Sequence, residues 1–118
     1  MQDFGVTLAP SGNANATYTE PSKNSDGSSL TDLKQTEVYY QIGTAAAVQA
    51  VVVPASKASG GGAVSTPLSV PVPAGVSTTV SFWATAMDTA GNESAKSAVV
   101  TKTFDLLTPD VPLNFTIA

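Results

Sequence analysis

Two stretches of the chain alternate between apolar and polar residues with a period of two, which is typical of half-buried β-strands. The first is TEVYYQIG, residues 36–43. Its alternation predicts one face formed by Val38, Tyr40 and Ile42. The opposite face is formed by Glu37, Tyr39 and Gln41. This segment is therefore predicted to be a strand with one face in the core.

The second alternating stretch lies within TVSFWATAMDTAGNES, residues 79–94. Its inward face is predicted to hold Val80, Phe82, Ala84 and Ala86. Its outward face holds Ser81, Trp83, Thr85 and Met87. The only tryptophan of the chain thus falls on the side predicted to face solvent, where something must either cover it or bind to it.

Short runs rich in Val and Thr predict five more strands, at residues 4–9, 15–20, 48–53, 67–72 and 98–104. The chain has 9 Gly and 8 Pro residues, which separate these runs at short intervals. About seven short strands joined by turns predict an all-β fold, an immunoglobulin-like sandwich.

The segments around these strands give three further expectations. Pro71 lacks an N–H donor, so the strand at 67–72 is expected at a sheet edge or with that nitrogen facing solvent. Residues 56–65, SKASGGGAVS, have no side chain suited to packing and are predicted to form a mobile loop. A short helix at 30–38 is an alternative local structure, because its apolar residues come near helical spacing.

Residues 18–43, YTEPSKNSDGSSLTDLKQTEVYYQIG, combine an aromatic residue, a proline, a polar loop and a Val-Tyr-Tyr strand. Residues 80–103, VSFWATAMDTAGNESAKSAVVTKT, combine a strand, a Gly-Asn turn and a returning strand. In this order and spacing, the two segments resemble a fibronectin type III domain, and the resemblance extends over residues 4–104. That family carries no catalytic site, and the resemblance implies a spacer, an adhesion module or a decoration element.

Three positions depart from the family pattern. Tyr18 replaces the tryptophan of the second strand, and Thr36 stands where the third strand usually has a tyrosine. Val80 stands at the tyrosine-corner position and cannot make the side-chain hydrogen bond that pins a loop in the family. A related immunoglobulin-like group is therefore the alternative to the family proper.

The composition argues against most catalytic and binding chemistry. The chain has no His, Cys or Arg, so it lacks the usual general base, the thiolate nucleophile and the commonest transition-metal ligands. We therefore predict no enzyme activity, no cofactor and no metal site. Five basic residues against nine acidic ones give a net charge of −4, which argues against nucleic acid. Neither a secretory signal nor an apolar run of ~18 residues is found, so no membrane partner is predicted.

Asp88, Asn92 and Glu93 lie close together in MDTAGNES, and their oxygens are suitable calcium ligands. Their spacing, however, is that of a hairpin turn in which Gly91 or Asn92 supplies a positive φ. A turn is the preferred interpretation, and a calcium site is the alternative.

Tyr39 and Trp83, on the predicted outward faces, are the first candidates for partner binding. Exposed aromatic rings are favoured as anchors of protein interfaces, and a tryptophan can also stack on a sugar ring. The remaining alternative is that Trp83 lies flat on its own sheet, flanked by Tyr39 or by a lysine stem.

The C-terminal segment gives the second group of candidates. We divide the chain into a sandwich over residues 1–105 and a tail over residues 106–118 that consists of a proline-containing linker and a strand-like end. Alternation predicts that one face of the end is lined by Leu113, Phe115 and Ile117. An unpaired apolar strand is an aggregation hazard, so it is expected to pair with its own sheet, to pair with a neighbouring subunit, or to begin a further repeat.

These features together predict a non-enzymatic structural module that binds other protein subunits. The uncharged surface and the tail favour a small bacteriophage virion protein, in capsid decoration, a neck or a tail. The alternative is an extracellular bacterial carbohydrate-binding or spacer module of a secreted enzyme or adhesin, in which Trp83 would contact a glycan.

Overall fold

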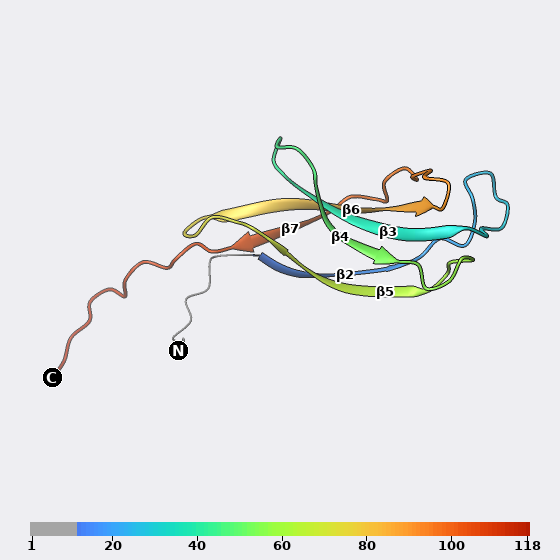
Figure 1. Cartoon of the computed structure of the whole chain (residues 1–118). Helices are drawn as coiled ribbons and strands as arrows, with labels where there is room; N and C mark the ends of the chain where they lie inside the picture. The colour runs from blue at the N-terminus through green and yellow to red at the C-terminus, as the bar shows by residue number, and fades with distance from the viewer. Residues whose placement is uncertain (1–11) are drawn as a thin grey trace.

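The structure is a computed structural model in which residues 12–118 are described, and this part of the chain is all-β (Figure 1). The strands are β2 (Gly12–Thr19), β3 (Leu33–Ile42), β4 (Val48–Pro54), β5 (Ala63–Val70), β6 (Ser77–Asp88) and β7 (Val100–Asp105). The predicted strand at 4–9 lies outside the described residues. The other predicted strands are all present, with boundaries that shift by a few residues.

The strands form two antiparallel sheets that lie in two layers, as in a β-sandwich (Figure 1). One sheet contains β2 and β5, and the other has the order β4-β3-β6-β7. The β3–β6 pairing is the longest, and it places Val38 opposite Ala84 and Tyr39 opposite Trp83. Residues of the two predicted alternating stretches are therefore direct neighbours in the four-stranded sheet.

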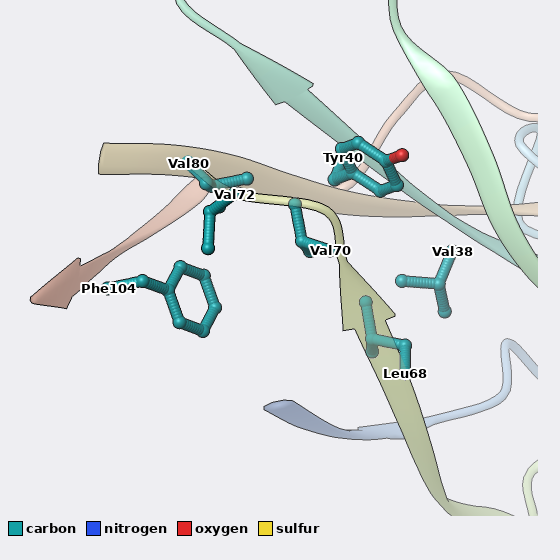
Figure 2. Close-up of a cluster of buried hydrophobic side chains, with 7 residues drawn as sticks. All are labelled: Val38, Tyr40, Leu68, Val70, Val72, Val80 and Phe104. Carbon is teal, nitrogen blue, oxygen red and sulfur yellow. The ribbon is translucent and has the colours of Figure 1, made fainter. Parts of the chain in front are cut away.

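A core of buried apolar side chains lies between the two layers (Figure 2). It consists of Val38, Tyr40, Leu68, Val70, Val72, Val80 and Phe104. Both sheets contribute to it, because Leu68 and Val70 come from β5 whereas the β3, β6 and β7 members come from the other layer. The faces predicted for Val38, Tyr40 and Val80 are confirmed.

The alternative helix at 30–38 is wrong, because β3 already begins at Leu33. Its β-branched and aromatic residues suit a pleated strand, and pairing with two neighbours outweighs the weak helical spacing. Leu30 and Leu33 are both buried, but each is held by a loop through its backbone N–H. Leu30 donates to Ser22 and Leu33 donates to Ala58.

The strand predicted at 67–72 begins earlier and ends before Pro71, since β5 covers Ala63–Val70. Pro67 lies inside β5, opposite Asn15 of β2. Within residues 12–118, β5 pairs with β2 alone, so Pro67 occupies an edge strand, where a missing N–H is tolerated.

The segment predicted as a mobile loop is fixed by the carboxylate of Glu20. That side chain is buried and accepts hydrogen bonds from Ser56 N–H at 2.9 Å, Ser56 Oγ at 2.6 Å and Gly62 N–H at 3.0 Å. Burial raises the pKa of Glu20, but these hydrogen bonds outweigh it and hold the pKa below its usual 4.5. Gly60 is required here, because its φ is +66° and a Cβ would lie 1.9 Å from the Pro21 carbonyl oxygen.

The tail leaves the sandwich after β7 and runs away from both sheets (Figure 1). Its last backbone contact with the domain is the hydrogen bond from Leu106 N–H to the Val76 carbonyl, at 3.1 Å. The predicted strand-like end is not a strand, because the chain bends at Leu113 and Asn114 and Asn114 has a φ of 57°. It pairs with no sheet in the described part of this chain.

Candidate functional site

Tyr39 and Trp83 form an aromatic patch on the outer face of the four-stranded sheet. Their positions are directly opposed in the β3–β6 register, and their rings stack with centroids 6.0 Å apart and an interplanar angle of 15°. Both side chains are half-buried. The structure therefore brings these two predicted residues together as a cross-strand pair.

Lys96 also lies over the ring of the tryptophan. Its Nζ lies 4.6 Å from the centroid of the Trp83 ring, which is the geometry of a cation–π contact. Trp83 is thus flanked by Tyr39 and by a lysine, as the last of its three sequence-based interpretations predicted.

The segment that carries Lys96 runs beside β6 where pairing with β7 has ended at Phe82. Serine hydroxyls accept hydrogen bonds from the backbone N–H groups along this part of the β6 edge. Ser97 Oγ accepts from Ala84 N–H at 3.0 Å, and Ser94 Oγ accepts from Ala86 N–H at 2.9 Å. The backbone N–H groups of the same serines donate back to β6. The segment is therefore held against β6 without forming a regular strand.

A partly buried polar cluster lies next to the aromatic patch, and sequence reasoning did not find it. The Tyr39 hydroxyl lies 2.9 Å from Glu37 Oε1 and 3.0 Å from Glu93 Oε2. Thr85 Oγ1 lies 3.3 Å and 2.7 Å from the same two carboxylate oxygens. Glu37 is only 1% exposed, although its face was predicted to be outward. The cluster fixes the hydroxyl end of Tyr39.

Hydrogen bonds set the ionisation of this cluster. Burial raises the pKa of Glu37, but donors including Gln35, Tyr39 and Thr85 outweigh it and hold that pKa below its usual 4.5. Burial also raises the pKa of Tyr39, and its bonds to Glu37 and Glu93 raise it further above 10.0. Glu37 is therefore an acceptor, and the Tyr39 hydroxyl keeps its proton.

The turn after β6 uses its carboxylate internally. Asp88 Oδ1 accepts from Ala90 N–H at 3.0 Å and Asn92 N–H at 2.9 Å, and Oδ2 accepts from Asn92 Nδ2 at 3.0 Å. These bonds, chiefly those from Asn92, lower the pKa of Asp88 below 3.8. Gly91 has a φ of 90°, which confirms the predicted turn. Within residues 12–118, no group of three acidic, His or Cys side chains could hold a metal ion.

The three predicted tail residues lie apart from the aromatic patch, in solvent. Leu113 and Phe115 are each 80% exposed, and Ile117 is 83% exposed. They are the most exposed large hydrophobic residues of residues 12–118. No described residue of this chain covers them.

An apolar groove of about 370 Å³ opens between the two sheets, along the side where β2 and β7 are the outer strands. We call it the edge groove. Ala14, Ala16 and Tyr18 line it from β2, Phe82 from β6, and Val100 from β7. The sequence could not reveal it, because it depends on how far apart two sheets and their edges lie.

Comparison with known proteins gives no match to a protein-family model, to a curated protein or to a solved structure. Residues 12–118 contain no helix that is long and apolar enough to cross a membrane.

Proposed function

We propose that the chain is a non-enzymatic assembly module of fibronectin type III type, which joins neighbouring protein subunits through its tail. The observation that carries this proposal is the exposure of Leu113, Phe115 and Ile117, each at least 80%. Apolar side chains of this size are normally buried, and a run of them on an extended segment is a strong reason for association.

The organisation of the sheets supports the fibronectin type III assignment. A four-stranded sheet of order β4-β3-β6-β7 packs against a sheet that contains β2 and β5. Two of the departures from the family pattern are in contact, because the Tyr18 hydroxyl and Thr36 Oγ1 lie 2.7 Å apart and join the two sheets. A polar bridge thus stands at positions where the family usually has two large aromatic residues.

The aromatic patch favours a protein partner over a carbohydrate. Lys96 Nζ already stands 4.6 Å from the centre of the Trp83 ring, where a sugar would stack, and Tyr39 packs beside it. A glycan would first have to displace the lysine. A protein surface can instead cover the edge of the stacked pair without disturbing it.

The composition supports a place in a large assembly, and we propose a small bacteriophage virion protein used in capsid decoration, a neck or a tail. Only 12% of the residues are charged, so the surface is formed mostly by Ser, Thr, Asn, Gln and Ala. Such a surface carries few charges that must be desolvated when subunits pack together.

The mass of the protein in solution tests the proposal. The full chain is expected to show a light-scattering mass above the 11.9 kDa of one copy and to gain mass with concentration. Phe115→Asp should return it to one copy, because a charge would replace an apolar contact. The matched control is Thr116→Asp, which adds the same charge on the other face of an extended tail and should assemble nearly as the parent does.

A mass of one copy at every concentration, for the parent and both variants, would contradict the proposal. Equal loss of assembly in both variants would also contradict it, because that result would reflect charge alone rather than an apolar face. Circular dichroism of each variant checks that the sandwich is still folded.

A further inference from the structure

The edge groove exposes residues that a closed sandwich would bury. Ala14, Ala16 and Tyr18 alternate along the inner side of β2, yet all three remain only half-buried. Phe82 lies on the inner side of β6, a central strand, and is also half-buried. Val100 of β7 is 64% exposed. The inner faces of both sheets are therefore incompletely covered along this one side.

The backbone on this side is also open to pairing. Within residues 12–118, β2 pairs only with β5, so its other edge offers N–H and C=O groups to an added strand. One end of the groove is closed, because Gly12 packs against the ring of Phe104, and a Cβ there would lie 2.5 Å from Cδ1 of that ring. A strand added beside β2 would thus have a backbone partner in β2 and apolar side chains of the opposite layer beneath it. The contact between Gly12 and Phe104 would limit how far it could extend along the groove.

We propose that the edge groove receives residues 111–118 of a second copy of this chain, paired with the edge of β2 that no other strand within residues 12–118 occupies. This inference rests on the proposed function and names the acceptor surface and the partner. Leu113, Phe115 and Ile117 would point into the groove on the same side of the sheet as Ala14 and Ala16. They would face Phe82 and Val100 of the opposite layer. Asn114 and Thr116 would face solvent, as the polar residues of β2 do.

The chemistry of the tail fits that of the groove. Residues 111–118 contain no Lys, Arg, Asp or Glu side chain, so no side-chain charge would be buried. The groove is lined mainly by alanine, aromatic and aliphatic side chains, and Lys102 is its one lining side chain with a charge. Three large apolar side chains at alternate positions suit a groove in which Phe82 and Val100 of the opposite layer face them and the alanines of β2 leave room beside them.

The path of the tail favours a second copy over the same chain. The tail continues away from the end of β7 and does not turn back toward the groove (Figure 1). Pro109 and Pro112 fix two φ angles, and both hold the preceding residue in an extended conformation. A return to the groove of the same copy would need a sharp reversal within this stiff segment.

This arrangement is heterologous, because the tail of one copy contacts the groove of the next. Repetition would give either a closed ring or an open filament, depending on the rotation between copies. Each copy inside such an array would have both a filled groove and a buried tail. A mixture with excess tail-deficient Phe115→Asp copies should therefore produce shorter assemblies, since each such copy ends a chain.

Disulfide trapping tests the inference, and the chain suits it because it has no cysteine. One full-length variant carries Thr116→Cys in the tail, and a second carries Thr17→Cys or Thr19→Cys on the exposed side of β2. The two β2 positions cover a shift of two residues in the register. Neighbouring strands bring Cα atoms within disulfide range, so the mixed variants should form a heterodimer under mild oxidation.

The control acceptor is Gln49→Cys on β4, which is exposed and lies on the other edge of the four-stranded sheet. A docked tail should give a heterodimer yield at β2 about tenfold or more above that at Gln49, because docking raises the local thiol concentration. Equal yields at both strands would overturn the inference. So would an intrachain disulfide in a monomeric Thr7→Cys/Thr17→Cys variant, which would place the chain's own residues 4–9 beside β2.

The failures of the two proposals are distinguishable. Assembly that depends on Phe115 but gives no trapping at β2 would leave the proposed function in place and overturn the edge groove as acceptor. A chain that remains a single copy and gives no intermolecular trapping would overturn both.

Discussion

The ring of Tyr39 stacks on the ring of Trp83, with centroids 6.0 Å apart, and the pair stands directly opposed across β3 and β6. Each ring thereby covers part of the other. Hydrogen bonds from the Tyr39 hydroxyl to Glu37 and Glu93 hold the tyrosine, and Lys96 covers the tryptophan. The outward tryptophan therefore packs against side chains of its own chain, and a ligand could not stack on its ring without displacing Lys96.

Removal of the lysine should expose the tryptophan. In Lys96→Ala the emission of Trp83, the only tryptophan, should shift to longer wavelength, and acrylamide should quench it more strongly. The reason is that the lysine stem and ammonium cover the ring in the parent chain. Lys34→Ala, a change at an exposed position of β3, is the control and should leave the spectrum unchanged. Identical spectra for both variants would show that Lys96 does not cover the ring.

The hydrogen bond between Tyr18 and Thr36 should stabilise the packing of the two sheets. Tyr18→Phe leaves the buried hydroxyl of Thr36, which is 2% exposed, without this partner and should lower the free energy of unfolding by about 1 kcal/mol. Thr36→Val keeps the shape and should cost a similar amount. Urea unfolding of both single variants and the double variant measures the coupling, and costs that simply add would mean that the two hydroxyls do not interact.

The buried carboxylates predict a loss of stability in acid. The pKa values of Glu20 and Glu37 are lowered in the folded chain from 4.5, so both groups favour folding when ionised. That stabilisation is fully present above pH 4.5 and is lost as the pH falls through their lower folded-state pKa values. The urea concentration at the unfolding midpoint should therefore decrease as the pH is lowered from about 7 to about 3, an interval that brackets these titrations.

Glu20→Gln provides the test of that assignment. It should cost about 1–3 kcal/mol at neutral pH, because three donors from Ser56 and Gly62 lose their carboxylate, and it should flatten the acid side of the profile. Asp110→Asn, in the exposed tail, should leave the profile nearly parallel to that of the parent. A Glu20→Gln profile with the full acid dependence would assign the loss to other groups.

The conformation of Asn114 predicts how the tail can be made to associate more tightly. Its φ of 57° lies in the left-handed region, which a β-branched residue avoids. Asn114→Thr should favour the extended form before docking and strengthen self-association by about threefold to tenfold. Asn114→Gly, which allows the bend freely, should weaken it. Sedimentation velocity gives both dissociation constants, and the opposite order would contradict an extended bound tail.

The alternation of residues was sufficient to predict the strands and most of their faces. Val38 and Tyr40 are in the core and Tyr39 is not, as the period of two requires. A Trp83 flanked by Tyr39 was one of three sequence-based alternatives, and the pairing of β3 with β6 places the two residues opposite each other. These features are local or involve two adjacent strands, so the sequence contains the information needed to predict them.

The features that were missed depend on segments that return from far along the chain. Glu37 shares its hydroxyl partners with Glu93, 56 residues later, and neither residue looks unusual in its own strand or turn. The loop after β4 is held by Glu20, more than 30 residues earlier. The tail was predicted as a strand from alternation alone, but a strand needs a pairing partner, and the described chain offers it none.

Hydrogen–deuterium exchange of the tail amides, measured over a range of protein concentrations, shows whether the tail is covered by a neighbouring copy. If the tail docks on a neighbouring copy, the amides of residues 113–117 should become protected as concentration rises, together with those of β2. Phe115→Asp should abolish the protection at both places. Exchange that stays fast at every concentration, or protection that does not depend on concentration, would contradict assembly through the tail.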